Sequence, residues 1–207
     1  MVNRESPFRG LASILLKGAG LLAVIAAGFY GGTEFALSKS AKSPGGDGIV
    51  YNGVWFTSTF AGSADQSPAL RAYVARTGIL ALAQSEVLYY QTGLDDEGRP
   101  LETRCQYHVG GGRFDSDWWS LAVYDDTNHY FPIPEVPASF NSVNVPAGED
   151  GRWTIAIGTR EDAEHAWIPV LDTGGFNLLL RLYRPGSAIR RNPGGVEMPE
   201  IRRLTCD

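Results

Sequence analysis

Cysteine and histidine are scarce in this sequence of 207 residues, which carries two cysteines and three histidines. Cys105 and Cys206 are too few and too far apart for a C-x-x-C redox pair or a cysteine-ligated zinc site. His108, His129 and His165 form no His-x-His or His-x-x-x-His pair. A zinc site needs three or four ligands that converge in space, so only convergence through the fold could make one here. We therefore expect strand or surface histidines, no metal site and no cofactor.

The common catalytic and phosphate-binding motifs are also absent. No serine lies in a G-x-S-x-G elbow, and no Walker or dinucleotide-binding fingerprint is present. Residues 110–112 are three glycines, but no clear helix follows them to bind a phosphate. The motifs therefore assign no catalytic residue, and whether the protein is an enzyme stays open.

Positive charge is sparse after the first 42 residues. Of the 18 basic and 23 acidic residues in the chain, five basic and two acidic ones precede residue 43, which leaves a net charge of −8 on residues 43–207. An acidic domain repels phosphate backbones, and no basic stripe with interleaved aromatic residues is present. This balance excludes nucleic acid as an expected partner.

The acidic residues occur in short clusters, which we interpret as solvated turns. Glycoside hydrolysis needs two carboxyl groups facing each other across a bond, and calcium needs several oxygens from one loop. The turn at residues 125–128 is rich in oxygen but lacks the spaced ligands of a known calcium loop. The clusters are Asp95-Asp96-Glu97, Asp115-x-Asp117, Asp125-Asp126 and Glu161-Asp162-x-Glu164.

One long apolar run is present near the N-terminus. Residues 11–30 carry a single charge, that of Lys17, which can reach the nearer membrane interface. About 20 apolar residues are needed to cross the hydrocarbon, and Phe29 and Tyr30 suit the headgroup region at the far end. We interpret this segment as a transmembrane signal-anchor helix that binds the lipid bilayer. A cleaved signal peptide, with Ala36-Leu37-Ser38 as its site, is the alternative.

The flanking charges predict the orientation of this helix. Arg4, Arg9 and Lys17 precede the apolar centre, so residues 1–10 should stay cytoplasmic and the rest of the chain should lie outside the cytoplasm. Residues 31–48 are rich in glycine and serine, which predicts a flexible tether.

The rest of the chain, residues 49–207, has the pattern of a mainly β domain. Ser67-Pro68 predicts the start of one short helix. Residues 86–91 and 101–109 then read as a hairpin around a turn at 95–100. Period-two alternation, with one face toward a core, follows in residues 119–124, 153–157 and 176–183, and residues 201–206 read as a last strand. About seven or eight strands of this kind predict a β-sandwich or jelly roll.

The predicted compartment gives the two cysteines a role. Outside the cytoplasm, two cysteines in one β domain predict a disulfide between Cys105 and Cys206, which would join the predicted hairpin to the last strand. Two buried free thiols are the alternative.

A set of landmarks runs in order through residues 50–207, including Glu86, Tyr89-Tyr90, Asp95, Gly98, Cys105-x-Tyr107, Trp118-Trp119-Ser120-Leu121, Trp167-Ile168-Pro169 and Arg181-Leu182-Tyr183-x-Pro185. Together these residues resemble the bacterial family called domain of unknown function 1214. The resemblance implies a mostly β domain with a jelly-roll-like core and no established reaction. The chain is similar in layout to short members that have one N-terminal helix and lack the 1254 domain often found beside this family. We expect it in the bacterial inner membrane, with its domain in the periplasm. Ala166 stands where the family usually has an asparagine.

Aromatic residues give the candidate binding site. Trp118 and Trp119 are adjacent, so in a strand one should enter the core and the other should be exposed or lie in a groove. Arg113 and Asp117 lie nearby in the sequence, and Arg181 and Tyr183 lie opposite a leucine stripe. These side chains suit a platform for a sugar or small ligand. The alternative is a structural arginine–aspartate pair, with the guanidinium stacked on a ring for packing alone. The five candidate binding residues are Arg113, Asp117, Trp118, Arg181 and Tyr183.

Three functional hypotheses follow. The first is a non-catalytic membrane-anchored envelope protein that binds a ligand or a partner. The second is a hydrolase acting on a cell-envelope glycan or lipid, with Asp117 and Asp125 as working groups. The third is a subunit that packs against another membrane protein through an exposed aromatic face. A catalytic cleft would bring together at least two of Asp117, Asp125, His108 and Arg181.

Overall fold

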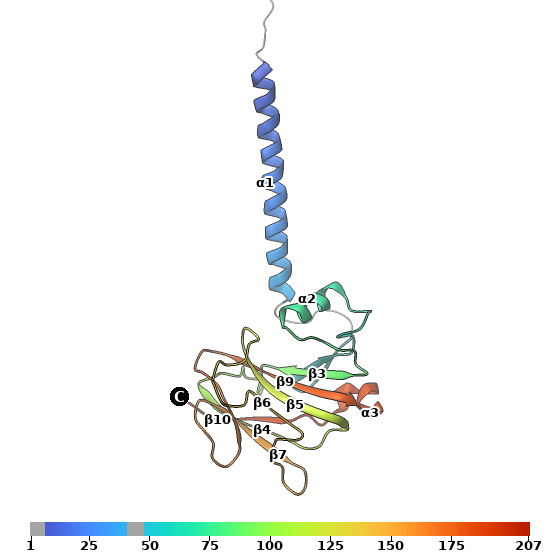
Figure 1. The fold of residues 1–207 in the computed structure, drawn as a ribbon, viewed down its shortest axis with the longest axis vertical. Helices are drawn as coiled ribbons and strands as arrows, with labels where there is room; N and C mark the ends of the chain where they lie inside the picture. The colour runs from blue at the N-terminus through green and yellow to red at the C-terminus, as the bar shows by residue number, and fades with distance from the viewer. Residues whose placement is uncertain (1–6, 41–47) are drawn as a thin grey trace, which may run out of the picture. The chain divides into compact units, whose positions relative to one another are not determined.

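The computed structural model describes residues 7–40 and 48–207. The chain divides into two compact units, residues 1–44 and residues 45–207. The first unit holds one long helix, and the second is a mainly β domain with two sheets (Figure 1).

The long helix, α1 (Pro7–Ser40), contains the apolar run. Its segment Ile14–Phe35 has 22 residues and a mean hydropathy of 1.8, so it is long and apolar enough to cross a membrane. At the helical rise per residue this segment spans about 33 Å, close to the thickness of bilayer hydrocarbon. The predicted N-terminal helix is therefore present, with a length and hydropathy suited to crossing a membrane.

The predicted flexible tether is wrong for residues 31–40, which continue α1 to Ser40. Two glycines at the start of this stretch weaken a helix by about 1 kcal/mol each relative to alanine. However, no proline follows before Pro44, and good helix formers such as glutamate, alanine and leucine lie between. The tether residues at 41–47 lie outside the described part of the chain.

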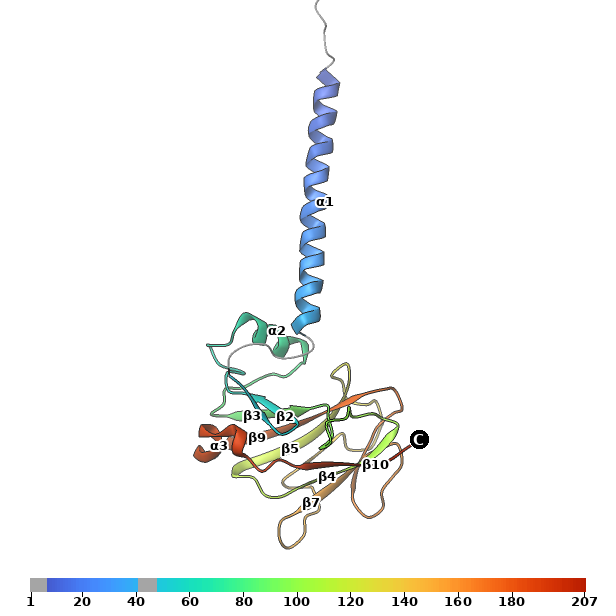
Figure 2. The same ribbon diagram turned by 180° about the vertical axis from the view of Figure 1, so that it is seen from behind.

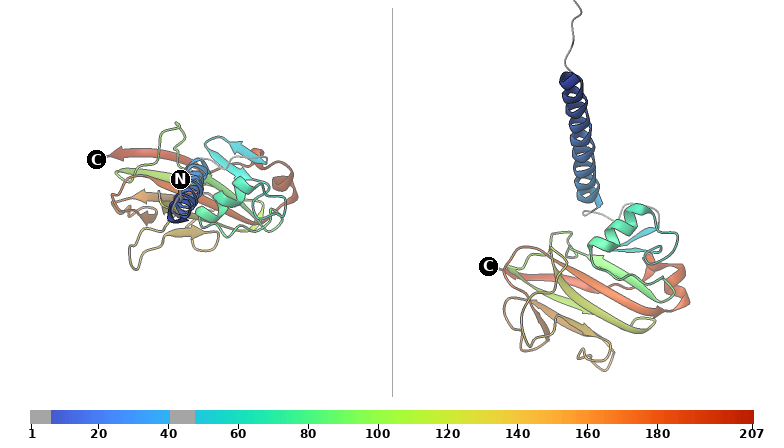
Figure 3. Two further views of the ribbon diagram at one scale, coloured as in Figure 1. Left: turned by 90° about the horizontal axis from the view of Figure 1, so that it is seen from above. Right: turned by 45° about the horizontal axis from the view of Figure 1, so that its top comes forward.

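The larger sheet of the domain has six strands, all paired antiparallel, in the order β1-β2-β3-β9-β5-β6. Its central strands β9 and β5 are paired over nearly their full length, and the three views show them side by side (Figures 1–3). The six strands are β1 (Ile49–Asn52), β2 (Trp55–Ser58), β3 (Val87–Thr92), β9 (Phe176–Pro185), β5 (Ser116–Asp125) and β6 (Ser139–Asn141).

The smaller sheet has four strands in the order β10-β4-β7-β8. Strands β10, β4 and β7, which are labelled in Figure 2, are antiparallel. Strand β8 runs parallel to β7. The jelly-roll connectivity implied by the resemblance stays a prediction. The four strands are β10 (Glu200–Cys206), β4 (Cys105–Gly111), β7 (Trp153–Gly158) and β8 (Ala166–Pro169).

Short helices flank the strands. Helix α2 (Pro68–Arg76) begins where predicted, because the Ser67 hydroxyl accepts the Leu70 backbone N–H (3.2 Å) and a proline occupies the first turn. It lies beside the six-stranded sheet (Figure 3), and its Tyr73 hydroxyl donates to Gln91 of β3. Helix α3 (Ser187–Arg191) and the 3-10 turn η1 (Pro193–Gly195) connect the two sheets.

The core lies between the two sheets and confirms the predicted inward faces. Trp119, Leu121 and Val123 of β5 are buried, and so are the odd-numbered residues of β7 and the even-numbered apolar residues of β9. From the other sheet, Tyr107 and Val109 of β4 enter the same cluster. The domain is therefore a β-sandwich with one contiguous apolar core.

The predicted hairpin at residues 86–109 is wrong. Strand β3 lies in the six-stranded sheet and β4 in the four-stranded sheet, and the only pairing between the two segments is an isolated bridge, Leu94–Pro100. The connecting loop crosses from one sheet to the other. It was predicted as a solvated turn, but the Asp95 carboxylate at its tip is only 1% exposed.

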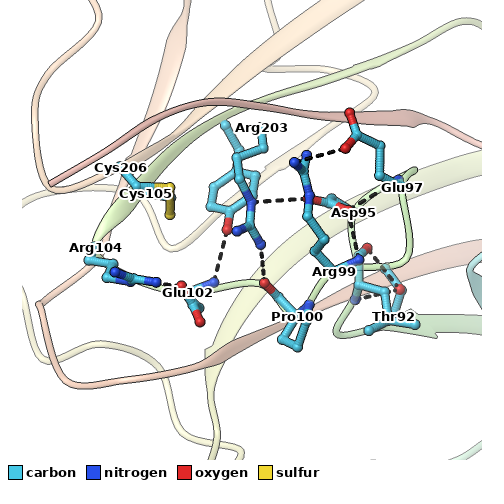
Figure 4. A network of polar contacts seen from close by, with 12 residues as sticks. Thr92, Asp95, Glu97, Arg99, Pro100, Glu102, Arg104, Cys105, Arg203 and Cys206 are labelled. Atoms are coloured by element: carbon cyan, nitrogen blue, oxygen red, sulfur yellow. Dashed lines mark hydrogen bonds and ion pairs between the residues drawn. A yellow bond between two sulfur atoms is a disulfide. The ribbon is translucent and has the colours of Figure 1, made fainter.

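Two arginines neutralise the buried Asp95 carboxylate (Figure 4). Its Oδ2 lies 2.9 Å from Arg99 Nε and 3.0 Å from Arg203 Nε, while Oδ1 accepts the backbone N–H groups of Glu97 and Arg99. Burial raises the pKa of Asp95, but these hydrogen bonds and the two guanidinium charges outweigh it and hold that pKa below its usual range. The network joins the loop to β10, the last strand of the chain.

The predicted disulfide is present between Cys105, at the start of β4, and Cys206, at the end of β10. The two residues are 101 positions apart in sequence and are cross-strand partners in the sheet. Next to it, the Arg203 guanidinium lies 5.4 Å from the centre of the Tyr107 ring and donates to the Pro100 carbonyl oxygen (Figure 4). The disulfide and the Asp95 network therefore both hold β10, the first to β4 and the second to the loop that precedes β4.

Candidate functional site

Two of the predicted binding residues form a pair on the outer face of the six-stranded sheet. Trp118 of β5 and Tyr183 of β9 are cross-strand partners, and their rings lie edge to face with centroids 4.8 Å apart. Trp119 is buried in the core, as expected for one member of the tryptophan pair, and Trp118 is partly buried against Tyr183. The rings thus pack on each other.

The charged residues predicted beside this pair lie apart from one another. Arg181 donates to the Tyr124 hydroxyl (2.8 Å), whose ring is stacked on Tyr130. Asp117 is exposed and pairs with Arg184 (3.2 Å). Arg181 and Asp117 therefore bond to other residues and do not form one group with the Trp118–Tyr183 pair.

Arg113, the fifth predicted residue, lies over a turn on the other side of β5. A side chain at Gly151, where φ is +76°, would collide with the Arg113 side chain. Arg113 lines a hollow of about 340 Å³ with Trp119 and Trp153. The two tryptophan rings are stacked there with centroids 4.7 Å apart.

The described residues bring together a different group, His108, Asp162 and His165. One ligand atom from each lies within 4.8 Å of the other two. His108 Nε2 is 2.9 Å from Asp162 Oδ2, and His165 Nδ1 is 3.1 Å from Asp162 Oδ1. The two imidazole rings lie 4.5 Å apart, centre to centre. We call these three residues the His–Asp cluster.

Sheet topology explains this convergence. His108 points outward from β4 because its neighbours Tyr107 and Val109 point into the core. Parallel pairing of β7 with β8 requires the chain to return from Gly158 to Ala166 within seven intervening residues. This return loop, residues 159–165, brings Asp162 to His108 across β7, the strand beside β4.

The Asp162 carboxylate is fixed within its own loop. Its Oδ1 accepts the backbone N–H groups of Glu164 (2.9 Å) and His165 (3.2 Å). The hydrogen bond to His108 is the leading cause that holds the pKa of Asp162 well below its usual range. Burial opposes it, and the bonds from Glu164 and His165 reinforce it. The carboxylate is thus ionised and held in place between two imidazoles.

Both histidines line a hollow of about 460 Å³ on the outer face of the four-stranded sheet. Strand β10 contributes Glu200 and Arg202 to the lining, and Arg152 and Glu164 come from the segments before β7 and β8. The lining therefore combines both signs of charge with two imidazoles. We call it the polar hollow.

The model of a family described as "Protein of unknown function (DUF1214)" matches residues 86–187. The chain carries a domain of this family. The DUF1214 match contains the whole His–Asp cluster and Cys105, whereas Cys206 and the β10 residues of the polar hollow lie beyond it. No curated protein matches the chain.

One solved structure supports the fold of this chain, and a second aligns more weakly. The crystal structure of the VPA0106 protein from Vibrio parahaemolyticus aligns with a TM-score of 0.57 at 19% identity, covering 99% of this chain and 47% of that chain. The chain thus spans about half the length of that relative. A putative uncharacterized protein from Burkholderia cenocepacia aligns with a TM-score of 0.46 at 12% identity, over 57% of this chain and 30% of that chain.

The acids suggested for hydrolysis do not meet in the DUF1214 domain. The Asp125 carboxylate accepts hydrogen bonds from Thr127 and from the His129 backbone N–H within one turn. Arg181 lies on the outer face of the six-stranded sheet, whereas His108 lies on the outer face of the other sheet. Among the described residues, the expected cleft containing two of Asp117, Asp125, His108 and Arg181 is therefore not formed.

Sequence reasoning missed the cluster because its members are separated. His108 and His165 lie on elements that meet only through the order β4-β7-β8, which the sequence pattern did not reveal. The available signal was the outward position of His108 in its alternating strand, together with the acid–histidine spacing in Asp162-x-x-His165.

Proposed function

We propose that this protein is a membrane-anchored envelope protein whose β-sandwich domain binds a small polar ligand in the polar hollow. The observation that carries the proposal is the hollow itself. Its volume of about 460 Å³ falls within the usual range for small-molecule sites, which is roughly 300–1,000 Å³.

The lining of the hollow determines the ligand class. Arg152 and Arg202 favour an anionic group, and the imidazoles and carboxylates offer further hydrogen bonds. Trp153, the aromatic residue of the lining, is buried and stacked on Trp119, so it offers little ring face to a sugar. These features favour an anionic small molecule, such as a sugar phosphate or dicarboxylate, over a neutral glycan.

The proposed location is the bacterial inner membrane, with the N-terminus in the cytoplasm and the domain in the periplasm. Helix α1 supports an anchor in the lipid bilayer, and the Cys105–Cys206 disulfide supports an oxidising compartment. The basic residues that precede the apolar segment support this orientation. A membrane-protein partner that contacts the domain stays a further prediction.

A ligand screen on the full chain in detergent tests binding. Each member of a panel of sugar phosphates, dicarboxylates and amino sugars is added at high concentration, and thermal unfolding is followed by tryptophan fluorescence. A ligand at 100 times its Kd should stabilise the domain by about 2.7 kcal/mol and raise Tm by about 5–10 °C.

Arg202→Ala should abolish the shift, because it removes a guanidinium that lines the hollow and is exposed. Arg191→Ala is the matched control, since Arg191 is exposed on α3 and does not line the hollow. The absence of a shift throughout the panel, or an equal shift in Arg202→Ala, would contradict the proposal.

A hydrolase acting on a cell-envelope glycan or lipid is the second candidate. The observation that favours it is the His–Asp cluster at the hollow, since imidazoles oriented by a carboxylate can act as a general base. Release of product from phosphate or acyl esters by the wild-type chain, and not by His108→Ala, is the result that would support it.

A further inference from the structure

The three residues of the His–Asp cluster have a spacing that suits a metal ion. In a tetrahedral zinc site with metal–ligand bonds of about 2.1 Å, neighbouring ligand atoms lie roughly 3.4 Å apart. His108 Nε2 and His165 Nδ1 lie 2.9 Å and 3.1 Å from the two Asp162 oxygens, and the three ligand atoms fall within 4.8 Å of one another. The most widely separated pair of donors would have to approach by at most about 1.4 Å to reach this spacing around an ion.

The surroundings hold these donors in place. Two backbone N–H groups of the return loop fix the Asp162 carboxylate, which is the kind of outer support that metal-binding carboxylates have. His108 is fixed by its place in the middle of β4, between strands β10 and β7.

We propose that His108, Asp162 and His165 bind a divalent transition-metal ion, with zinc as the best fit, and that its remaining coordination position faces the polar hollow. Imidazole and carboxylate donors suit zinc, nickel or copper(II), whereas calcium and magnesium take oxygen donors throughout. Soft thiolate donors are excluded because both cysteines form the disulfide.

Three protein ligands leave a fourth position for water or for a ligand, which distinguishes open zinc sites from closed structural ones. Both histidines line the polar hollow, so the fourth coordination position is accessible to a water molecule or a ligand in the hollow. The inference concerns the same region as the proposed ligand site but does not depend on it, because the metal is measured alone.

The test is zinc binding by the full chain in detergent, prepared without a polyhistidine tag and freed of metal with a chelator. Competition with a chromophoric chelator should show one zinc ion per chain. His108→Ala and His165→Ala should each weaken zinc binding at least tenfold. His129→Ala is the matched control, because His129 bonds to Thr127 in a turn and does not belong to the cluster.

Two further measurements keep the result interpretable. Asp162→Asn preserves an oxygen that can accept the backbone N–H groups of the loop, so it should fold normally and still lose zinc affinity. Cobalt(II) substituted into the wild-type chain should give the intense visible absorption of a tetrahedral site, and this band should be absent from His165→Ala.

The proposal is overturned if the wild-type chain binds no stoichiometric zinc, or if His108→Ala and His129→Ala bind it equally. The ligand screen is run with and without chelator, so failure of the metal site and failure of ligand binding are separate results. A ligand shift that survives chelation and Asp162→Asn would leave the proposed function standing and remove the metal from it.

Discussion

Replacing Asp95 with asparagine tests whether the buried ion pairs stabilise the junction of the two sheets. Asparagine keeps one oxygen for the two backbone N–H groups of the turn. It places an amide N–H₂ or a neutral oxygen against the guanidinium groups of Arg99 and Arg203, where a carboxylate oxygen accepted a hydrogen bond from Arg99 and formed an ion pair with Arg203. The change therefore removes charge without removing bulk.

The two arginines should contribute unequally to the cost. The Arg203 side chain is 13% exposed, so it keeps a largely desolvated charge when Asp95 is neutralised. The Arg99 side chain is 43% exposed and can turn to water or to Glu97. Breaking a buried pair typically costs 3–5 kcal/mol, and the exposure of Arg99 places this case near the lower end, at about 3 kcal/mol.

Urea unfolding of the full chain in detergent, followed by tryptophan fluorescence, measures this cost. All five tryptophans lie between residues 55 and 167, so the signal reports on the domain and not on α1. A loss of about 3 kcal/mol should lower the midpoint by roughly 1–2 M urea. Glu97→Gln is the control: its carboxylate is 70% exposed and pairs with Arg99, so its loss should cost less than about 1 kcal/mol.

The same variant should change the response to acid. The folded pKa of Asp95 lies below its unfolded value, so its stabilising contribution is complete above about pH 4 and is lost as the pH falls further through the folded pKa. Wild-type stability should therefore fall more steeply below pH 4 than that of Asp95→Asn. Equal midpoint shifts in Asp95→Asn and Glu97→Gln, with parallel acid profiles, would refute the reasoning.

Two more predictions concern the disulfide and the topology. Replacing Cys206 with serine opens a loop of 101 residues and should cost up to about 4–5 kcal/mol in the chain-entropy model, measured by the same urea assay. An unchanged midpoint would show that the Asp95 network alone fastens β10. For the topology, alkaline phosphatase fused after Asp207 should be active in bacteria, and an inactive fusion with normal expression would place the domain in the cytoplasm.

The strands with clear period-two alternation could be predicted from sequence. Residues 119–124, 153–157 and 176–183 alternate strongly, and each is a strand with the expected face in the core. The short strands β1, β2, β6 and β8 were missed, since three or four residues carry too little periodicity to recognise. Ser67-Pro68 gave the start of α2 because capping is a local property of the chain.

Strand pairing was harder to predict than strand location. The segments around Asp95 have the turn residues of a hairpin, yet β3 and β4 belong to different sheets. The loop between them is held by the Asp95–Arg203 pair, which joins residues far apart in the sequence and leaves no local signal. Similarly, of the predicted binding residues, Trp118 and Tyr183 contact each other, whereas Asp117 and Arg181 pair with other residues.

The His–Asp cluster is the opposite case, in which residues far apart in the sequence meet in space. His108 and His165 are far apart in the sequence, which left convergence through the fold as the only way they could meet. His108 lies in β4 and His165 directly before β8, in keeping with the expected strand or surface positions. The two histidines come together because β7 pairs in parallel with β8, and no residue type in the sequence predicts that pairing. A site formed by a return loop over a sheet can be found only once the strand order is known.

The position of β9 in the six-stranded sheet has a consequence for how the domain assembles. It is the ninth of ten strands along the chain, yet it separates β3 from β5 and pairs with both. Pairings such as Leu88 with Leu182 join residues about 90 positions apart, so a long loop must close before most of the apolar surface is covered. The earlier strands β3 and β5 therefore keep open edges until residues 176–185 have been synthesised, and the six-stranded sheet can be completed only after that.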